Sequence, residues 1–404
     1  MTKRLTMLPA LIVTLALVGA GCGGDDDDDG GGGGGGGDGG ETLQVGYAAS
    51  QTGRLALFEQ PLLEGLQAQI DAINADGGID GSTQIELEVR DCASDPQRCG
   101  VVAQELIDGG AQVLISPCDV DASLPAAQIA QRDQVPIINS CGSGSSFREQ
   151  VGEFAFLNVY GTVAEGQAMA ELASDDGHKT AGMMTSSDIE YTESIIDAAG
   201  ERFEELGGQV VETQQFKLDQ PRYSSQATAL ANADPDVIMT SMFLPAANTF
   251  LQNLRAAGYD GPVIGPDGMQ GDEIFAAGNA ARDVTVAGFA IAGTEDGDLT
   301  QAFIDTFTEQ TGKEPPSLAF AALGADIAIT INDAVTAAGS TDPPAIRDAI
   351  DELEGVQGAT GEYSYAGLGG IPSKDVVFVK TNVESDQFDF LDRFVPEAVQ
   401  EGAE

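Results

Sequence analysis

The sequence predicts an α/β protein with two doubly wound parallel-sheet lobes. From Leu43 onward short apolar strands alternate with amphipathic helical stretches, a pattern typical of βαβ units around a parallel sheet. The alternation restarts after Tyr160. A helix, a Gly-Gly pair and a strand follow one another once in each half, at Gly77-Gly78 and at Gly207-Gly208. We therefore expect two similar lobes facing a cleft at their strand ends, where open α/β sheets bind ligands.

The first half opens with a strand and a helix. Apolar residues from Leu62 to Ile73 recur at the spacing of one helix face, and Gly77-Gly78 ends that helix. The expected strands are Leu43–Ala48, Ile85–Val89, Val113–Ser116 and Pro136–Asn139, and the later helices are Pro96–Ile107 and Ala122–Gln131.

The second half repeats this order. The expected helices are Val163–Ala173, Thr192–Leu206, Ser224–Ala233 and Ala246–Ala257, and the strands are Thr180–Thr185, Gln209–Phe216, Val237–Ser241 and Val263–Gly265. Two further helical stretches, Leu299–Thr311 and Leu318–Ala338, precede strands near Gly361–Tyr365 and Val376–Lys380. The chain is therefore expected to cross between the lobes more than once. Residues 42–160 and 291–360 would form lobe 1, and residues 161–290 and 361–404 would form lobe 2.

The N-terminus has the features of an export signal. A cationic tip precedes an apolar run from Leu5 to Ala20, which is short for a bilayer span of about 20 residues. Gly19-Ala20-Gly21-Cys22 resembles a bacterial lipobox, although Gly19 stands where that motif usually has Leu. We expect residues 1–21 to be a lipoprotein signal peptide and Cys22 to be the lipidated mature N-terminus. Ordinary signal-peptide cleavage and an uncleaved anchor are the alternatives.

Acidic residues dominate the composition, with a formal net charge of −47 and a single histidine. Nucleic acid requires a basic surface, so we expect no nucleic-acid partner. Direct adsorption to anionic lipid is disfavoured as well, which leaves membrane attachment to the lipid on Cys22. Residues 22–41, which are almost all Gly and Asp, cannot build a core and predict a disordered linker.

Four cysteines remain once Cys22 is set aside, an even number in an oxidising compartment. They are Cys92, Cys99, Cys118 and Cys141. This count favours two disulfides over four free buried thiols. The cysteine spacing is not CxxC, and the single histidine, His178, lies far along the chain. We therefore expect no metal site, the alternative being zinc held by all four thiolates.

Motifs of catalysis are missing. The sequence has no Gly-x-Ser-x-Gly elbow, no P-loop and no Gly-x-Gly-x-x-Gly after the first strand, and His178 has no evident partner. We therefore expect neither an enzyme nor a bound cofactor. The run from Cys141 to Ser146 fits both a backbone-amide anion nest and an ordinary strand-to-helix loop.

Short motifs in a fixed order resemble the leucine/isoleucine/valine-binding family, the type I periplasmic binding proteins of ABC importers. They are Gln51-Thr52-Gly53, Ile73-Asn74-Ala75-Asp76-Gly77-Gly78-Ile79-Asp80-Gly81, Asp95-Pro96, Gly258-Tyr259, Gly265-Pro266-Asp267-Gly268 and Gly358-Ala359-Thr360-Gly361. The resemblance covers Leu43 to about Lys380. It implies two lobes, joined by three crossovers, that close on a small ligand.

The resemblance also implies a ligand pocket. Loops at Cys118–Asp121 and Cys141–Ser143 would receive the ligand carboxylate, Asp267 would pair with its ammonium, and aromatic side chains would surround the rest. The expected ligand-binding residues are Phe58, Asp119, Val120, Cys141, Ser143, Tyr191, Phe243, Asp267 and Phe320.

The first of these loops departs from the family. Asp119, Val120 and Asp121 stand where serines are common, and two acids would repel a ligand carboxylate. Either they turn outward or the ligand differs. The pocket residues also have simpler interpretations. Asp267 fits an ordinary turn, the three phenylalanines fit a core, and Tyr191 could merely pack beside an N-cap at Thr192.

The disulfide pairing follows from a 2-1-3-4-5 strand order. The third and fourth strands are then neighbours, which predicts Cys118–Cys141 with Cα atoms about 5.5–6 Å apart. Cys92 ends the edge strand and Cys99 starts the next helix, which predicts Cys92–Cys99. The bridge usual in the family, which would here be Cys92–Cys118, is the competing pairing.

Together these features predict a lipid-anchored solute-binding protein. We expect it to capture a small polar solute, such as a branched-chain or related amino acid, and to deliver it to an ABC transporter permease. We expect an exported monomer, anchored to the outer face of the cell membrane. A ligand-sensing lipoprotein and a secreted enzyme on the same fold are the alternatives.

Overall fold

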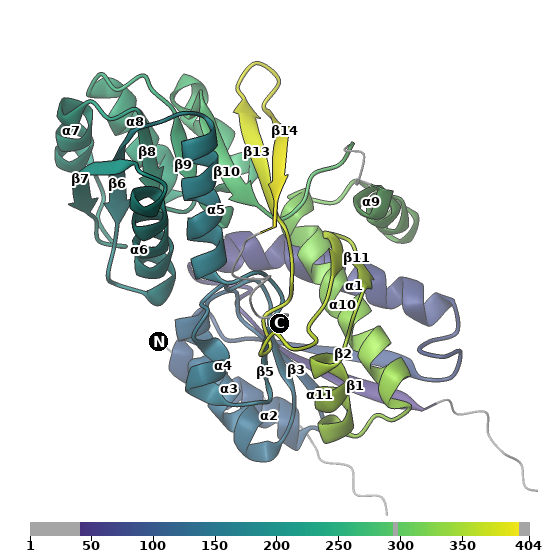
Figure 1. The fold of residues 1–404 in the computed structure, drawn as a ribbon. Coiled ribbons are helices and arrows are strands. Elements are labelled where there is room, and N and C mark those ends of the chain that lie inside the picture. The colour runs from purple at the N-terminus through teal and green to yellow at the C-terminus, as the bar shows by residue number, and fades with distance from the viewer. Residues whose placement is uncertain (1–40, 294–297, 396–404) are drawn as a thin grey trace, which may run out of the picture. The chain divides into compact units, whose positions relative to one another are not determined.

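The computed structural model describes residues 41–293 and 298–395 (Figure 1). The predicted signal peptide, the lipidation site Cys22 and nearly all of the predicted linker lie outside the described residues. Residues 396–404, which the sequence assigns to lobe 2, lie outside them as well.

The first lobe is built on a five-stranded parallel sheet with strand order β2-β1-β3-β4-β5. Its strands are β1 (Thr42–Ala49), β2 (Gln84–Asp91), β3 (Val113–Ser116), β4 (Ile137–Asn139) and β5 (Ala155–Leu157). The helices between them are α1 (Ala56–Ala75), α2 (Pro96–Asp108), α3 (Val120–Asp133) and α4 (Phe147–Val151). Ser116 pairs with Asn139 across β3 and β4, so the loops that follow these strands start side by side.

The second lobe repeats this order as β7-β6-β8-β9-β10. Its strands are β6 (Thr180–Thr185), β7 (Gln209–Gln215), β8 (Val237–Thr240), β9 (Val263–Gly265) and β10 (Val284–Gly288). Its helices are α5 (Thr162–Asp175), α6 (Glu190–Glu205), α7 (Ser224–Ala233), α8 (Ala246–Ala256) and the 3₁₀ segments η1 (Asp267–Met269) and η2 (Asp272–Ala281). The shared order confirms the two similar lobes that the sequence predicts.

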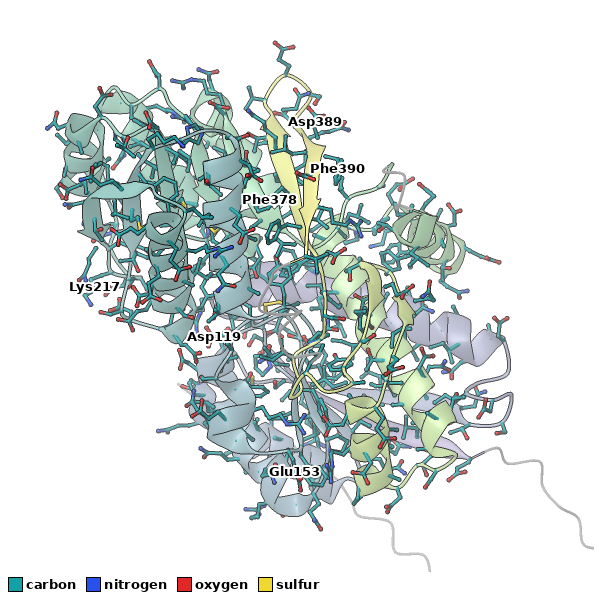
Figure 2. All side chains as sticks on the ribbon, in the orientation of Figure 1. Asp119, Glu153, Lys217, Phe378, Asp389 and Phe390 are labelled. Atoms are coloured by element: carbon teal, nitrogen blue, oxygen red, sulfur yellow. A yellow bond between two sulfur atoms is a disulfide. The ribbon has the colours of Figure 1, made fainter. Side chains whose placement is uncertain are left out.

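A β-hairpin extends the second sheet beyond β10. Its strands β13 (Val376–Asn382) and β14 (Gln387–Phe394) add antiparallel to the parallel part of the sheet and are drawn in yellow in Figure 1. Phe378 on β13 is buried in the core, whereas Phe390 on β14 is 43% exposed (Figure 2). The hairpin therefore forms the outer edge of this sheet.

The chain between β10 and β13 packs on the first lobe. It forms α9 (Asp298–Thr311), α10 (Leu318–Ala338), α11 (Pro343–Asp351) and the small hairpin β11 (Val356–Gly358) and β12 (Gly361–Tyr363). Helices α1 and α10 approach closely because both carry glycine at the contact. A Cβ on Gly65 or on Gly324 would lie 1.9 Å from a carbonyl oxygen of the facing helix. Among the described residues α10 alone is long and apolar enough to cross a membrane, but 78% of that apolar stretch is buried, as in a core helix.

Several short elements of the fold are not among those predicted from the sequence. β5 and β10 have three and five residues, yet each completes the fifth position of its sheet. The last crossing between the lobes also differs from the prediction. The sequence assigns residue 361 onward to lobe 2, but Tyr365 Oη donates to the Leu157 carbonyl, and Leu157 N donates to the Gly370 carbonyl. These contacts with β5 place the crossing later, before β13, while the other predicted lobe boundaries remain predictions.

Two disulfides tie the loops of the first lobe. Cys92 is bonded to Cys99 and Cys118 to Cys141, with Cα–Cα distances of 4.8 Å and 4.5 Å. These are the predicted pairs, and the competing Cys92–Cys118 bridge is not formed. The second bridge joins the loops that follow β3 and β4, as expected for neighbouring strands.

Candidate functional site: a cavity lined by both lobes

One cavity is lined by residues from both lobes and has about 550 Å³ of atom-free space, including its open mouth. All nine residues predicted to contact ligand line this cavity: Phe58, Asp119, Val120, Cys141, Ser143, Tyr191, Phe243, Asp267 and Phe320. The sequence therefore located the cavity, while the role of each residue in binding remains a prediction.

Aromatic rings form the apolar part of the wall. Phe58 at the start of α1 meets Phe243 edge to face, with ring centroids 6.5 Å apart, and lies 5.2 Å from the ring of Phe320 on α10. Tyr191 on α6 meets Phe243 edge to face at 6.0 Å. Phe58 and Phe320 come from the first lobe, and Tyr191 and Phe243 from the second. The rings are thus shared between the lobes and are not simply the core of one of them.

Asp267 is a buried carboxylate at the second lobe's side of the cavity. It follows β9 and begins η1. Its Oδ1 accepts a 2.5 Å hydrogen bond from Tyr191 Oη, whereas its Oδ2 has no hydrogen-bond partner although the residue is only 4% exposed. Burial raises the pKa of Asp267 to about 7, although the hydrogen bond from Tyr191 lowers it. An unpartnered carboxylate oxygen in such a place is a candidate acceptor for a ligand donor.

Glycine at position 268 makes this geometry possible. A Cβ there would lie 2.6 Å from the Cβ of Phe243 and 2.9 Å from Tyr191 Oη. Gly268 N also donates a 3.2 Å hydrogen bond to Tyr191 Oη. The glycine therefore allows the tyrosine to reach Asp267.

Glu165 lies behind Asp267 and was not predicted. It sits in the first turn of α5, is fully buried, and its Oε1 accepts from Asp267 N at 2.7 Å. Burial, and secondly the charge of Asp267, raise the pKa of Glu165 well above its usual value. A signal was present, because Glu165 shares a helix face with Met169 and Leu172. An acidic residue on the apolar face of a helix is unusual, and it can indicate a functional site.

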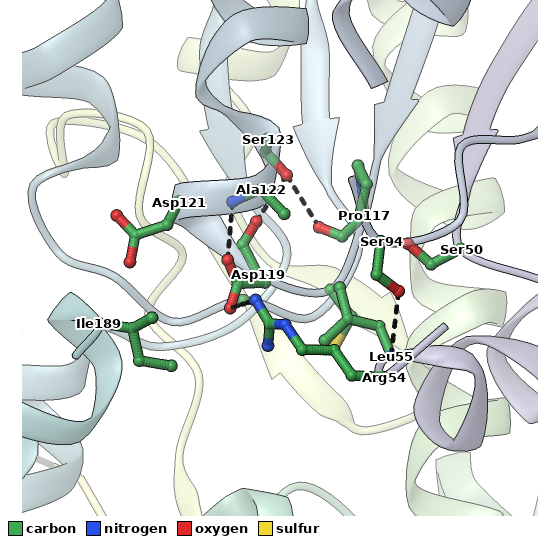
Figure 3. Close-up of polar contacts among 12 residues, drawn as sticks. Ser50, Arg54, Leu55, Ser94, Pro117, Asp119, Asp121, Ala122, Ser123 and Ile189 are labelled. Carbon is green, nitrogen blue, oxygen red and sulfur yellow. Dashed lines mark hydrogen bonds and ion pairs between the residues drawn. The ribbon is translucent and has the colours of Figure 1, made fainter. Parts of the chain in front are cut away.

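Asp119 occupies the N-terminus of α3 as its N-cap (Figure 3). Its Oδ1 accepts a 2.7 Å hydrogen bond from Ala122 N, and its Oδ2 accepts one of 2.8 Å from the guanidinium of Arg54. The residue is 8% exposed and lies among the elements around the cavity (Figure 2). Of the two alternatives given for the acids of this loop, the outward turn does not hold for Asp119, because its carboxylate is held inward by the helix N-terminus and by a cation.

Arg54 was not singled out from the sequence. It is the one basic side chain among the described residues that line the cavity, and its side chain is 40% exposed. Nothing in the sequence around Gln51-Thr52-Gly53 connects it with Asp119, which is 65 positions away. The pairing arises only when the loops after β1 and β3 come together.

Direct hydrogen bonds join the two lobes beside the cavity. Ser146 Oγ donates to Glu190 Oε2 at 2.6 Å, and Ser146 N donates to Glu190 Oε1 at 3.2 Å. Glu190 N in turn donates to Asp121 Oδ2 at 3.2 Å. Burial, and then the charge of Asp119, raise the pKa of Asp121. Asp121 and Glu190 are thus two further acids of the wall.

The loop after β4 contributes a hydroxyl. Ser143 is 1% exposed, and its Oγ has no hydrogen-bond partner. The neighbouring amide of Gly142 already donates to Asn139 Oδ1 at 2.6 Å. This loop was expected to receive a ligand carboxylate. The hydroxyl of Ser143 is free to bond a ligand, but the amide of Gly142 is already bonded to Asn139.

The described residues of the cavity combine features of a small-molecule binding surface. They contain no group of three or more His, Cys, Asp or Glu side chains placed to hold a metal ion. What the cavity offers is an aromatic enclosure, a free hydroxyl and a free carboxylate oxygen. Such a surface can recognise a small, partly apolar molecule that carries a hydrogen-bond donor.

Comparison with known proteins agrees with this site. The family model described as periplasmic binding protein matches residues 42–387. A leucine-, isoleucine-, valine-, threonine- and alanine-binding protein from Pseudomonas aeruginosa is 23% identical over 315 residues, covering 77% of this chain and 82% of that protein. A Leu/Ile/Val-binding protein homolog from Brucella abortus is also 23% identical, covering 81% and 87%.

Solved structures share the fold. The leucine-binding protein LivK from Thermotoga maritima superposes with a TM-score of 0.79 at 24% identity, covering 88% of this chain and 99% of that one. LivJ from Streptococcus pneumoniae, solved in complex with isoleucine, gives 0.79 at 22% identity with the same coverage. A solute-binding protein from Rhodopseudomonas palustris in complex with benzoate gives 0.76 at 19% identity, covering 88% and 97%.

These relatives are binding proteins and not enzymes, which confirms the prediction that the chain is not an enzyme. The family model spans nearly all of the described residues and both lobes. The fold is the type I arrangement of two parallel-sheet lobes seen in LivK and LivJ. The chain therefore belongs to the periplasmic binding protein family, whose members work outside the cytoplasm.

Proposed function

We propose that this protein is a lipid-anchored solute-binding protein that captures an amino acid or a related small solute and delivers it to an ABC permease. The observation that carries the proposal is the cavity between Phe58 and Phe320 of one lobe and Tyr191, Phe243 and Asp267 of the other. A ligand held there contacts both lobes, so its binding free energy stabilises their association.

The proposed contacts divide by chemistry. Asp267 Oδ2 accepts from the ligand's ammonium, Ser143 Oγ bonds a polar group on the opposite side, and the aromatic rings enclose the apolar part. Asp119, Val120 and Cys141 complete the wall at the first lobe. A solute bound in this way loses its water, which favours partners that satisfy its charge.

A thermal-shift screen of amino acids, amines, amides and small carboxylates tests the binding function. A ligand present at 100 times its Kd should stabilise the protein by about 2.7 kcal/mol. Titration calorimetry of each hit should then give saturable one-site binding without turnover of the solute. If no compound of these classes stabilises the protein, the proposed solute class is wrong.

Lipid anchoring and delivery need separate tests. Cys22→Ala should release the protein or leave its precursor unprocessed, since the lipid attaches to that thiol; processing and membrane retention like the wild type would contradict the anchor. Uptake of the labelled solute should fall when the gene is deleted and recover on complementation. Unchanged uptake despite tight binding would favour the second candidate, a ligand-sensing lipoprotein.

A further inference from the structure

The cavity offers few places for a ligand carboxylate. Its hydrogen-bond donors at the first lobe include the N-terminus of α3, the amides of the Cys118 and Gly142 loops, the hydroxyl of Ser143 and the guanidinium of Arg54. Such groups are the usual partners of a carboxylate in a protein.

Four of these donor groups are already paired within the protein, whereas the Ser143 hydroxyl is free. Ala122 N at the start of α3 donates to Asp119 Oδ1 at 2.7 Å, and Arg54 donates to Asp119 Oδ2 at 2.8 Å (Figure 3). Cys118 N donates to Glu59 Oε1 at 2.7 Å, and Gly142 N donates to Asn139 Oδ1 at 2.6 Å. Asp119 therefore stands, as a carboxylate of the protein itself, where a ligand carboxylate would otherwise bind.

The charge of the wall points in the same direction. Asp119, Asp121, Glu190 and Asp267 line the cavity, against Arg54 as the one basic side chain among its described lining residues. The carboxylate of a ligand placed beside these acids would be repelled by their like charges, since little water is present to screen them. If Arg54 turned to a ligand carboxylate instead, it would leave Asp119 buried without its cation.

Partners for a cation, by contrast, are free. Asp267 Oδ2 is buried, has no hydrogen-bond partner and belongs to a residue that lines the cavity. The rings of Phe58, Tyr191 and Phe243 line the same space, and aromatic faces attract ammonium groups. The free hydroxyl of Ser143 can serve a neutral polar group.

We infer that the cavity selects a small organic cation that carries no carboxylate beside its ammonium group, and so prefers an amine to the α-amino acid of the same side chain. This inference rests on the proposed binding function and narrows its solute class. It also gives Asp119 and Arg54 a role in specificity, since together they exclude the α-carboxylate.

Matched probes isolate the carboxylate. Leucine, leucinamide and 3-methylbutylamine share a side chain and an ammonium, and differ in having a carboxylate, a neutral amide or neither. Calorimetry on the full-length protein in detergent should show 3-methylbutylamine binding at least tenfold tighter than leucine, with leucinamide between them or equal to the amine. The neutral isostere 3-methylbutanol should bind at least tenfold more weakly than the amine, which separates charge recognition from apolar burial.

A substitution at the N-cap should reverse the preference. Asp119→Ser keeps a capping oxygen but removes the charge and frees Arg54, so leucine should gain at least tenfold in affinity relative to the amine. Asp119→Asn is the second variant if the first does not fold, as judged by far-UV circular dichroism. Asp133→Asn, which removes a charge at the other end of α3 outside the cavity, should leave the ratio unchanged.

The outcomes are distinct. Leucine binding as tightly as 3-methylbutylamine, or tighter, would overturn this inference and leave the proposed binding function in place. No binding by amines and amino acids alike would overturn both. An Asp119→Ser variant that gains no affinity for leucine would show that Asp119 does not set the specificity.

Discussion

Tyr191 Oη and Asp267 Oδ1 are 2.5 Å apart, and this hydrogen bond aims one carboxylate oxygen at the tyrosine and leaves the other, Oδ2, without a partner. Tyr191 comes from α6 and Asp267 from η1, so the bond fixes the carboxylate between two elements of the second lobe. The free oxygen belongs to a residue of the cavity wall.

Asp267→Asn should strongly weaken binding of a cationic probe. The substitution keeps the shape of the side chain but removes its charge, and breaking a desolvated charge pair costs about 2–5 kcal/mol, or roughly 30- to several-thousand-fold in Kd. Calorimetry with 3-methylbutylamine, or with the best amine or amino acid of the screen, measures the change.

Two controls accompany this variant. Asp272→Asn carries the same charge change five residues further on, outside the cavity, and should bind like the wild type. A far-UV spectrum confirms that Asp267→Asn is folded. A change of less than threefold in Kd would show that Asp267 is only a turn residue.

Binding of a cation should strengthen as the pH rises through about 7. Burial holds the pKa of Asp267 near 7, so below that pH the carboxyl is mostly protonated and must lose its proton to pair with an ammonium. Affinity should fall by up to tenfold per pH unit below 7 and level off above it. Calorimetry at pH 6 in buffers of different ionisation enthalpy should show proton release on binding.

The same groups predict the opposite trend for the ligand-free fold. Asp267 binds its proton up to about pH 7 when folded but only to about pH 4 when unfolded, so its contribution to the free energy of unfolding decreases as the pH rises through that window. The buried Glu165 adds to this trend. In Asp267→Asn the pH dependence of cation binding should disappear, and a Kd for the wild type that is constant from pH 5 to 8 would contradict the assignment.

The sequence predicted the fold and the cavity for different reasons. Alternating strands and helices determine the two sheets. Phe58, Tyr191 and Asp267 lie at the start of the helical elements that follow β1, β6 and β9, where motif order locates them. Arg54 and Glu165 were missed because their roles come from contacts with Asp119 and Asp267 that are 65 and 102 positions away in the chain. Asp119 shows most clearly what the sequence could not predict. Its acidic side chain was recognised as unusual in this loop, but its role as the N-cap depends on the residue at which α3 begins.

The two disulfides should contribute differently to stability and binding. From loop-closure entropy the 23-residue separation of Cys118–Cys141 is worth about 3 kcal/mol and the 7-residue separation of Cys92–Cys99 about 2 kcal/mol. Paired Cys→Ala variants and denaturant titration compare them. Both Cys118 and Cys141 line the cavity, whereas Cys92 and Cys99 do not, so only the first pair should also weaken binding of the probe.

Non-reducing peptide mapping of the exported protein should establish the pairing before the Cys→Ala variants are compared. It should yield one linked peptide with Cys92 and Cys99 and another with Cys118 and Cys141. A peptide that links Cys92 to Cys118 would contradict the pairing. Equal loss of probe affinity in both double variants would show that the second bridge has no particular role at the cavity.

Loss of the buried pair between Lys374 and Asp326 should destabilise the protein more than any exposed ion pair. Lys374 Nζ contacts Asp326 Oδ2, and both residues are buried, at 4% and 0% exposure. Asp326 on α10 also accepts from Ala359 N at 2.5 Å, so it joins that helix to the segment before the last crossing.

Lys374→Met leaves the carboxylate buried without its cation, which should reduce the free energy of unfolding by about 3–5 kcal/mol. Lys313→Met breaks the exposed pair with Glu64 and should change it by less than about 1 kcal/mol. Urea titrations of the two variants measure the difference, and equal effects would mean that Asp326 is neutral or reaches water in the folded protein.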